Sequence, residues 1–252
     1  MMKVYFVGAG PGDPDLITVK GKSVLERADI VVYAGSLING RLLESCKEGC
    51  EFHDSAALNL DEVTAVYAAA KGTGKTVVRL HSGEPSIYGA IKEQIDWLVA
   101  NGIEYAIVPG VSSFAAAAAA LSAELTLPGI SQTVVITRMA GRTPVPQGQE
   151  IHALAEHKPT MCIFLSVQMI DSLVGELKQG YPNDTPVAVV EKASWPDERV
   201  IKGTLADITS KVGEAGITKT AMIIVGGVLA GEYERSKLYD PAFSHEYRVS
   251  EG

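Results

Sequence analysis

Residues 82–89, with the sequence SGEPSIYG, combine a tight-turn pattern with several side chains that could contact a ligand. They follow the apolar, β-branched run 76–80 and precede residues 91–99, whose apolar positions have helical spacing. This order predicts a strand, a turn and a helix, and open α/β sheets bind ligands at such turns, at the carboxyl ends of the strands. Gly83 would let the backbone approach a ligand because it has no Cβ, and Glu84 places a carboxylate beside the bend. An ordinary connecting turn would explain the Gly and Pro, but it explains the crowding of Ser, Glu and Tyr less well.

Two other segments resemble nucleotide-binding loops but lack an essential feature. Residues 8–12 approach the G-x-G-x-x-G dinucleotide fingerprint, yet Pro11 removes one amide where a pyrophosphate would need a donor. We therefore exclude NAD and FAD binding here and expect either a tight connecting turn or a loop whose backbone lines a ligand site. Residues 72–76, GTGKT, resemble the end of a phosphate-binding loop, but they close a predicted helix and enter a strand. A solvated turn is the better interpretation of that segment.

Residues 137–146 contain two arginines, Arg138 and Arg142, around a Gly-containing loop that follows a predicted strand. The guanidinium group matches the geometry of a carboxylate bidentately, which an ammonium group does not. This pattern is typical of a site for carboxylates, and it is equally typical of a surface loop with two solvated arginines. The residues alone leave both interpretations open.

The three cysteines show no disulfide framework. Cys46 and Cys50 lie close in sequence to His53, but this set lacks a fourth ligand at a recognised spacing, and structural zinc usually takes four. We expect Cys46, Cys50 and Cys162 to be ordinary reduced thiols, and we expect no metal bound by the protein.

The composition indicates a globular protein without a membrane or nucleic-acid role. Apolar residues make up 46% of the 252 positions and charged residues 21%, and no apolar run approaches the roughly 20 residues that span a bilayer. The net charge of −8 disfavours binding to nucleic acid or to an anionic membrane, although a few arginines in a cleft could still bind an anionic small molecule. The start of the chain lacks a secretory cleavage pattern, so we expect a cytoplasmic protein.

These candidate residues must be positioned by two successive sets of elements. In the first half, predicted strands alternate with predicted helices, which indicates a parallel sheet with helices on both faces. The expected strands cover residues 3–8, 30–33, 51–53, 76–80 and 104–108, and the expected helices cover residues 18–27, 59–70, 91–99 and 115–120.

The second half begins a new set, in which several short strands lie close together in sequence and favour a mixed sheet with antiparallel neighbours. The expected strands cover residues 132–137, 160–165, 186–191, 200–203 and 221–225, and the expected helices cover residues 170–177 and 206–214. Gly180 is expected to close the first of these helices. We place an N-terminal α/β domain at residues 1–113, a C-terminal α/β domain at 114–240 and a polar tail at 241–252.

Three loops together carry a resemblance to a known family. Residues 7–13 (VGAGPGD), 82–89 (SGEPSIYG) and 108–113 (VPGVSS) resemble, in this order and spacing, the motifs of the tetrapyrrole (corrin and sirohaem) methyltransferases. The resemblance covers nearly the whole chain. It implies an α/β fold of two domains, the first with a mainly parallel sheet and the second with a mixed sheet, and S-adenosylmethionine in the cleft between them. It also implies a homodimer and an anionic tetrapyrrole substrate.

The resemblance assigns cofactor-binding residues in both halves of the chain. They are Pro11, Ser82, Gly83, Glu84, Ile87, Ser112, Ser113, Leu165 and Ala193. Family members usually carry Asp where this chain has Glu84, and Thr-Ala where it has Ser112 and Ser113. Arg138 and Arg142 are predicted to pair with the acetate and propionate groups of the substrate.

Two loops resemble one branch of the family. Residues 33–38 (YAGSLI) and 137–146 (TRMAGRTPVP) are similar to those of members that methylate C-11 of precorrin-4 or cobalt-precorrin-4 in cobalamin biosynthesis. Uroporphyrinogen III methyltransferases carry an Asp-Arg pair after the tyrosine that corresponds to Tyr33, and that Asp is their proposed base; this chain has Ala34 there. The alternatives are methylation at another carbon of a precorrin or of uroporphyrinogen III, and a tetrapyrrole-binding carrier.

We assign no catalytic residue from the sequence. Asp13, His53, Asp54 and His81 are polar and lie near predicted strand ends, and each is more typical of a structural or solvated position. Methyl transfer to an electron-rich carbon needs little help from a base, so the reaction does not require one of them.

Overall fold

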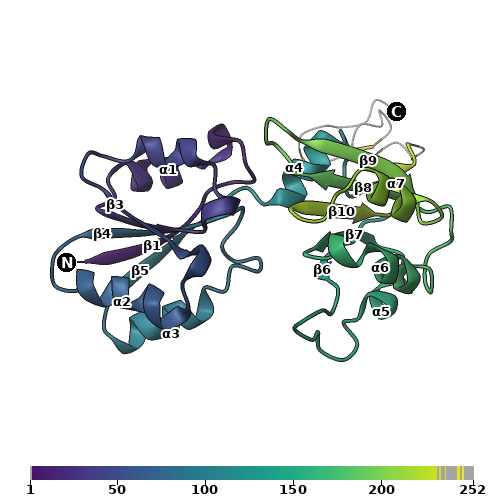
Figure 1. Cartoon of the computed structure of the whole chain (residues 1–252). Helices are drawn as coiled ribbons and strands as arrows, with labels where there is room; N and C mark the ends of the chain where they lie inside the picture. The colour runs from purple at the N-terminus through teal and green to yellow at the C-terminus, as the bar shows by residue number, and fades with distance from the viewer. Residues whose placement is uncertain (1, 232, 234–235, 237–242, 245, 247–252) are drawn as a thin grey trace. The chain divides into compact units, whose positions relative to one another are not determined.

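The computed structural model describes residues 2–231, 233, 236, 243, 244 and 246, and for Ser36 only the backbone. The chain forms two compact units (Figure 1). The first contains Met1–Ala116 and Ala193–Asp197, and the second contains Ala117–Lys192 and Glu198–Gly252. The polar tail that we expect from residue 241 onward lies outside the described residues, except for 243, 244 and 246.

The first unit is built on a five-stranded parallel sheet with the order β3-β2-β4-β1-β5. Its strands are β1 (Lys3–Gly8), β2 (Ile30–Tyr33), β3 (Glu51–Asp54), β4 (Thr76–His81) and β5 (Glu104–Val108). Its helices are α1 (Val19–Glu26), α2 (Leu60–Ala70) and α3 (Lys92–Ala100), with short 3-10 turns η1 (Pro14–Leu16), η2 (Gly35–Leu37), η3 (Gly40–Ser45) and η4 (Ser55–Ala57). Helix α1 covers one face of the sheet, and α2 and α3 cover the other (Figure 1).

The sequence explains why this sheet is buried on both faces. Its central strands carry buried apolar residues on both faces, as parallel strands with helices on both sides require. One core cluster packs under α2 and α3 around Phe6 and Tyr67, and a second packs under α1 around Leu25 and Leu80. Helix α2 begins with a capping box, because Asn59 accepts a hydrogen bond from the Glu62 amide and Glu62 accepts one from the Asn59 amide.

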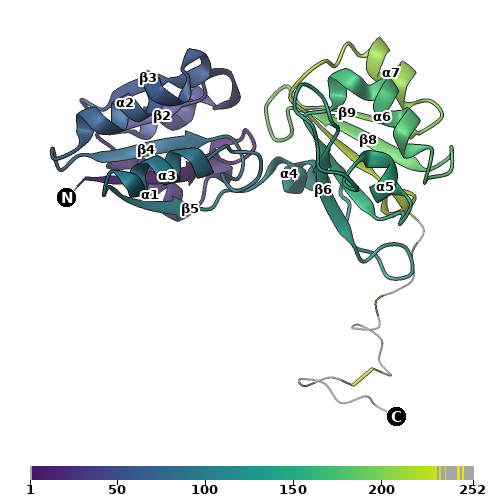
Figure 2. The same ribbon diagram turned by 90° about the horizontal axis from the view of Figure 1, so that it is seen from below.

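The second unit contains a mixed five-stranded sheet with the order β6-β7-β10-β8-β9, in which only β6 and β7 are parallel neighbours. Its strands are β6 (Val134–Arg138), β7 (Thr160–Phe164), β8 (Pro186–Glu191), β9 (Arg199–Thr204) and β10 (Ala221–Val225). Its helices are α5 (Ile151–Ala155), α6 (Ile170–Leu177) and α7 (Ile208–Glu214), with η5 (Val167–Met169) and η6 (Gly227–Leu229); the chain enters this unit within α4 (Ser113–Ala120). Helices α5, α6 and α7 share one core cluster with the sheet (Figure 2).

The expectations for fold class are confirmed, since a parallel sheet and a mixed sheet occur in the predicted order. The expectation for Gly180 is wrong. Helix α6 ends at Leu177, and a Cβ at Gly180 would lie 2.3 Å from the carbonyl carbon of Ala155. Gly180 therefore serves close backbone packing against α5, a helix that the periodicity did not predict, and not a left-handed helix cap.

Within the described residues, no helix combines the length and the apolar character needed to cross a membrane.

Candidate functional site

Three predicted loops lie side by side at the carboxyl edge of the first sheet. Strand β1 lies between β4 and β5, so the loops that follow these three strands are neighbours. The Ala9 amide donates to the His81 carbonyl at 2.7 Å, and the Gly83 amide donates to the Gly10 carbonyl at 2.8 Å. Gly10 and Gly83 thereby form an isolated antiparallel bridge. Main-chain hydrogen bonds alone therefore connect two of the motif loops.

Glycines allow the three loops to pack this closely. A Cβ at Gly8 would lie 2.5 Å from the Gly110 Cα, and a Cβ at Gly110 would lie 2.1 Å from the Gly83 carbonyl oxygen. Gly83 differs from both, because it has a left-handed φ of +64° and a Cβ there would meet nothing closer than the Ser113 amide nitrogen at 3.7 Å. The close approach of backbone to backbone occurs at Gly8 and Gly110. At Gly83, a side chain would extend into the space beside Ser112 and Ser113.

Glu84 joins the second motif loop to the third. One of its carboxylate oxygens accepts a hydrogen bond from the Gly110 amide at 2.8 Å, and the other accepts one from the Ser86 amide at 2.9 Å. Partial burial raises the pKa of Glu84, but the hydrogen bonds from Ser86 and Gly110 outweigh it and hold the pKa below 4.5. Glu84 is therefore an ionised brace at neutral pH.

The segment Ala193–Asp197 lies in sequence between β8 and β9, yet it packs with the first unit. The Trp195 indole nitrogen donates to the Pro11 carbonyl at 2.9 Å, and the Asp13 amide donates to the Ser194 hydroxyl at 3.0 Å. A Cβ on Gly12 would lie 2.1 Å from the Trp195 ring, so the indole covers this glycine directly. Sequence reasoning missed Trp195 and Ser194; the signal was a tryptophan beside a proline just after a predicted strand.

The predicted cofactor-binding residues fall into two groups. Eight of them, in the motif loops and in the segment Ala193–Asp197, belong to the first unit: Pro11, Ser82, Gly83, Glu84, Ile87, Ser112, Ser113 and Ala193. Leu165 belongs to the second unit, together with the predicted substrate residues Arg138 and Arg142.

In the second unit, four loops meet at one edge of the sheet. Strands β6, β7 and β8 end there, and β10 begins there because it runs antiparallel to β7 and β8. Hydrogen bonds connect these loops: the Met139 amide donates to the Ser166 hydroxyl at 2.9 Å, and the Lys192 amide donates to the Thr220 carbonyl at 2.8 Å.

This edge of the second unit holds a cavity of about 600 Å³, which we call the cation-lined cavity. It is lined by Arg138, Met139, Gly141, Arg142, Thr143, Leu165, Val167, Gln168, Met169, Thr218 and Lys219. Three of these residues are cationic, none is acidic, and four carry large apolar side chains. Leu165 has a left-handed φ of 54° and is 71% exposed, a strained and solvated arrangement for a bulky apolar residue. The cavity is suited to an anionic ligand with an apolar face.

The two arginines of this cavity differ in their surroundings. The Arg138 guanidinium donates to the carbonyls of Met139, Thr143 and Pro144 at 3.2, 3.1 and 2.8 Å, so it holds its own loop closed. Arg142 is exposed at the far part of this loop. The structure thus brings both predicted arginines to one cavity but gives Arg138 a structural task that the sequence did not indicate.

Three of the four acid–base candidates are held by nearby groups in structural roles. Asp13 caps η1 by accepting from the Asp15 amide at 2.9 Å, and His53 pairs with Glu51 at 2.7 Å. Asp54 accepts from the amides of Gly35 and Ala56, both at 2.9 Å.

His81 is the fourth candidate, and it is buried at the end of β4 with 7% of its surface exposed. Its Nε2 atom has no hydrogen-bond partner among the residues that the structure describes, and its ring centroid lies 6.0 Å from that of Phe6. Burial, with a smaller contribution from the charge of Arg79, lowers the pKa of His81 to about 3. A neutral imidazole of such low basicity is poorly suited to act as a general base near pH 7.

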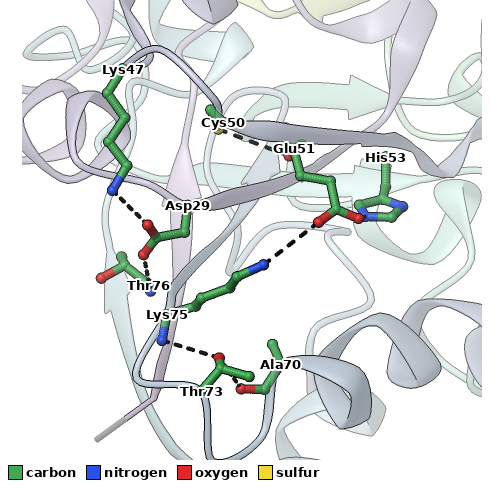
Figure 3. A network of polar contacts seen from close by, with 9 residues as sticks. All are labelled: Asp29, Lys47, Cys50, Glu51, His53, Ala70, Thr73, Lys75 and Thr76. Carbon is green, nitrogen blue, oxygen red and sulfur yellow. Dashed lines mark hydrogen bonds and ion pairs between the residues drawn. The ribbon is translucent and has the colours of Figure 1, made fainter.

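Cys50 lies within a network of polar contacts at the amino-terminal ends of β2, β3 and β4 (Figure 3). The Asp29 carboxylate binds the Lys47 ammonium at 2.5 Å and the Thr76 amide at 2.7 Å. Burial raises the pKa of Cys46 to about 12, which disfavours the thiolate form that ligates metals. Among the residues that the structure describes, no group of three or more His, Cys, Asp or Glu side chains is arranged to hold a metal ion.

The chain is similar over nearly its whole length to proteins of known activity. The cobalt-precorrin-4 C(11)-methyltransferase of Methanocaldococcus jannaschii is 58% identical over 98% of this chain and 96% of that protein. The precorrin-4 C(11)-methyltransferase of Pseudomonas aeruginosa is 48% identical over 99% of this chain and 100% of that protein.

Solved structures share the fold. The crystal structure of a cobalt precorrin-4 methyltransferase, a cobalamin biosynthetic enzyme, has a TM-score of 0.88 and 46% identity, covering 90% of this chain and 95% of that one. The uroporphyrin-III C-methyltransferase of Thermus thermophilus, in complex with S-adenosyl homocysteine, has a TM-score of 0.75 and 27% identity over 92% of this chain and 96% of that one. A sequence model of the tetrapyrrole (corrin/porphyrin) methylases matches residues 3–209. The chain belongs to the tetrapyrrole (corrin/porphyrin) methylase family.

Proposed function

We propose that this chain is an S-adenosylmethionine-dependent methyltransferase that methylates C-11 of precorrin-4 or cobalt-precorrin-4 in cobalamin biosynthesis. The observation that carries the proposal is the cation-lined cavity, which pairs three cationic side chains with an apolar lining in a protein of net charge −8. A tetrapyrrole intermediate, an apolar macrocycle with acetate and propionate groups, has the complementary chemistry.

The loops of the first unit suit the methyl donor. We assign donor binding to Pro11, Ser82, Gly83, Glu84, Ile87, Ser112, Ser113, Leu165 and Ala193. Gly83 supports the assignment, because its φ is left-handed and a side chain at this position would enter the space beside Ser112 and Ser113. Backbone groups at this edge and the ionised Glu84 are suited to a zwitterionic donor that carries a sulfonium charge.

The chemistry places few demands on reactive side chains. When bound, the donor supplies a methyl group already activated by the sulfonium: a substrate carbon forms the new C–C bond, the C–S bond breaks, and a neutral thioether leaves. By releasing a proton to water, the substrate loses the positive charge that it gains. The protein contributes alignment of the two reactants, which is worth up to roughly 7–11 kcal/mol in well-oriented reactions. The structural roles of Asp13, His53 and Asp54 and the low basicity of His81 support a mechanism without a dedicated side-chain base.

Two alternatives remain to be compared with this proposal. One is methylation at another carbon of a precorrin or of uroporphyrinogen III. Ala34, which offers no acid–base group where the uroporphyrinogen III methyltransferases carry their Asp, favours C-11 methylation over the uroporphyrinogen III reaction. The other is a carrier that binds a tetrapyrrole without methyl transfer, and the tightly packed glycine loops of the first unit argue for a donor site instead.

The test uses S-adenosylmethionine labelled with carbon-13 in its methyl group, incubated separately with precorrin-4, cobalt-precorrin-4 and uroporphyrinogen III. We expect label at C-11 of one precorrin, located by carbon NMR, and no label on uroporphyrinogen III. The metal-free and cobalt substrates distinguish the oxygen-dependent from the anaerobic route. Label at another carbon would contradict the regiochemistry, and tetrapyrrole binding without any transfer would support a carrier.

We also propose that the protein is a cytoplasmic homodimer that binds no metal of its own. Free thiols at Cys46, Cys50 and Cys162 support a reducing compartment. Light scattering coupled to size-exclusion chromatography measures the oligomeric state, and elemental analysis of the purified protein measures bound metal. A monomer, or one equivalent of metal retained after chelation, would contradict these two assignments.

A further inference from the structure

We propose that Lys219 and Arg142 bind the carboxylates of the tetrapyrrole directly, and that Arg138 is a positioning residue that fixes the loop carrying Arg142. This inference rests on the proposed function and deepens it. It adds a residue that no motif indicated, and it separates the roles of two arginines that the sequence treats alike.

Lys219 precedes β10, and the direction of this strand places Lys219 at the cation-lined cavity. Strand β10 runs antiparallel to β7, with Ile223 opposite Ile163. Residues just before β10 therefore lie at the edge where β7 ends, and Lys219 and Leu165 line the same cavity. The Thr220 carbonyl accepts a hydrogen bond from the Lys192 amide at 2.8 Å, which fixes the backbone beside Lys219.

Among the described residues, no acidic side chain lines this cavity or pairs with its cations. Lys211, in the same unit, forms an ion pair with Asp207 at 2.6 Å. Lys219, in contrast, forms no ion pair within the described part of the chain, and no residue that lines its cavity is acidic. A cluster of unpaired cations over an apolar surface is the electrostatic complement of a carboxylated macrocycle.

Arg138 uses three of the five N–H donors of its guanidinium group within its own loop. Two of its three hydrogen bonds come from Nη1 and one from Nη2, and all three end on carbonyls between Met139 and Pro144. These bonds cross the base of the loop that presents Arg142. Lysine cannot reproduce them, because its ammonium group lacks the planar fork of donors.

The experiment measures binding of uroporphyrin III, a fluorescent octacarboxylate tetrapyrrole, to the full chain and to single variants. We expect Lys219→Ala and Arg142→Ala each to weaken binding about threefold to tenfold, and Lys219→Arg to restore most of it. Affinity for S-adenosylmethionine is expected to stay unchanged in all three. The matched control is Lys178→Ala, which follows α6 and lies at the opposite edge of the sheet from the cavity; its porphyrin affinity is expected to equal that of the wild type.

Salt provides a second measurement on the same proteins. Raising the NaCl concentration weakens binding to exposed cations, so the salt dependence of the wild type is expected to be steeper than that of Lys219→Ala. Identical affinity and identical salt dependence for the wild type and Lys219→Ala would overturn the role of Lys219.

The role of Arg138 is tested through the loop itself. Trypsin cleaves after Arg142, and we expect both Arg138→Ala and Arg138→Lys to speed this cleavage, measured by mass spectrometry, while Lys219→Ala leaves it unchanged. Unchanged cleavage in both Arg138 variants would overturn the positioning role. If porphyrin binding depends on Lys219 but no precorrin is methylated, the proposed function fails and this inference stands. If methylation proceeds normally and Lys219→Ala binds as the wild type does, only this inference fails.

Discussion

The Glu84 carboxylate accepts a hydrogen bond from the Gly110 amide at 2.8 Å, which ties the loop after β4 to the loop after β5. The same carboxylate accepts from the Ser86 amide at 2.9 Å. One side chain thus sets the spacing of two motif loops on either side of the loop after β1. The shape of the proposed donor site depends on this connection.

Replacing Glu84 should loosen the donor site without unfolding the protein. We expect Glu84→Ala to raise the Kd for S-adenosylmethionine about tenfold, because two charge-assisted hydrogen bonds are lost, and Glu84→Gln to raise it less, because one amide oxygen can still accept. Calorimetric titration checks this. Equal affinity in the wild type and Glu84→Ala would contradict the role of this brace.

The Glu84 carboxylate should also make the free energy of unfolding depend on pH in the acidic range. Its pKa is lower in the folded chain than the ordinary value of 4.5, so its contribution is full above that pH and is lost as the pH falls through the folded-state pKa. The difference in unfolding free energy between the wild type and Glu84→Gln is therefore expected to shrink below pH 4.5. Chemical denaturation across this pH range measures it, and a constant difference would contradict the assigned hydrogen bonds.

Leucine substitutions at Gly83 and, as a matched control, at Gly49 test the proposed donor site sterically. Gly83→Leu should abolish S-adenosylmethionine binding, because the side chain would enter the space beside Ser112 and Ser113. Gly49 also has a positive φ, +78°, but a Cβ there would meet nothing within 4 Å. Gly49→Leu carries the same backbone penalty, about 1–2 kcal/mol, without filling the proposed site.

Titration calorimetry on the two leucine variants separates backbone strain from loss of the site. We expect similar loss of stability in both and loss of donor binding in Gly83→Leu alone. Normal affinity in Gly83→Leu would remove Gly83 from the donor site.

Trp195 lies outside the motif loops, yet replacing it should weaken the affinity for the donor. Trp195→Phe removes the indole donor to the Pro11 carbonyl but keeps a ring over Gly12. We expect the KM for S-adenosylmethionine to rise roughly threefold to tenfold with little change in kcat, because one hydrogen bond that positions the loop is lost. Trp195→Leu is expected to have a larger effect.

Trp97 provides the control for this substitution. It lies in α3, and its ring centroid is 6.3 Å from that of Tyr67, so Trp97→Phe should change stability without changing the KM for the donor. A KM in Trp195→Phe equal to that of the wild type would show that the segment Ala193–Asp197 does not position the loop.

His81 predicts a loss of stability in mild acid. Its pKa is about 3 in the folded chain and 6.5 in the unfolded chain. Between these pH values the imidazole is protonated in the unfolded state and neutral in the folded state. The contribution is full above pH 6.5 and declines toward pH 3. Between pH 7.5 and 5 we expect the wild type to lose about 2 kcal/mol more than His81→Gln or His81→Asn. Parallel losses in the wild type and both variants would contradict the buried neutral imidazole.

The sequence predicted the strands, helices and loops that form the site. It did not predict which of these loops lie next to one another in space. Apolar runs and turn residues located the motif loops, and the alternation of strands and helices predicted a parallel sheet. The strand order β4-β1-β5, which makes these loops neighbours, comes from pairing between strands far apart in sequence. Local patterns do not encode such pairing. For the same reason, the close backbone packing between Gly8 and Gly110 was not predicted.

Residues that reach the site by an indirect route were missed. Parallel strands place functional residues after their carboxyl ends, but Lys219 precedes a strand; only the antiparallel direction of β10 brings it to the cation-lined cavity. Trp195 acts on a loop 184 residues earlier in the chain. The hydrogen bonds of Arg138 to its own loop were equally hidden, because an arginine that binds carbonyls and one that binds a carboxylate have the same appearance in sequence.

The most direct test of the account is a crystal structure of the chain with S-adenosylhomocysteine, the product of the proposed donor. The account predicts that the ligand contacts the main chain of residues 82–87 and lies beside Ser112 and Ser113. A ligand bound only in the cation-lined cavity, or near the Asp29 network of Figure 3, with no contact to these loops, would contradict it.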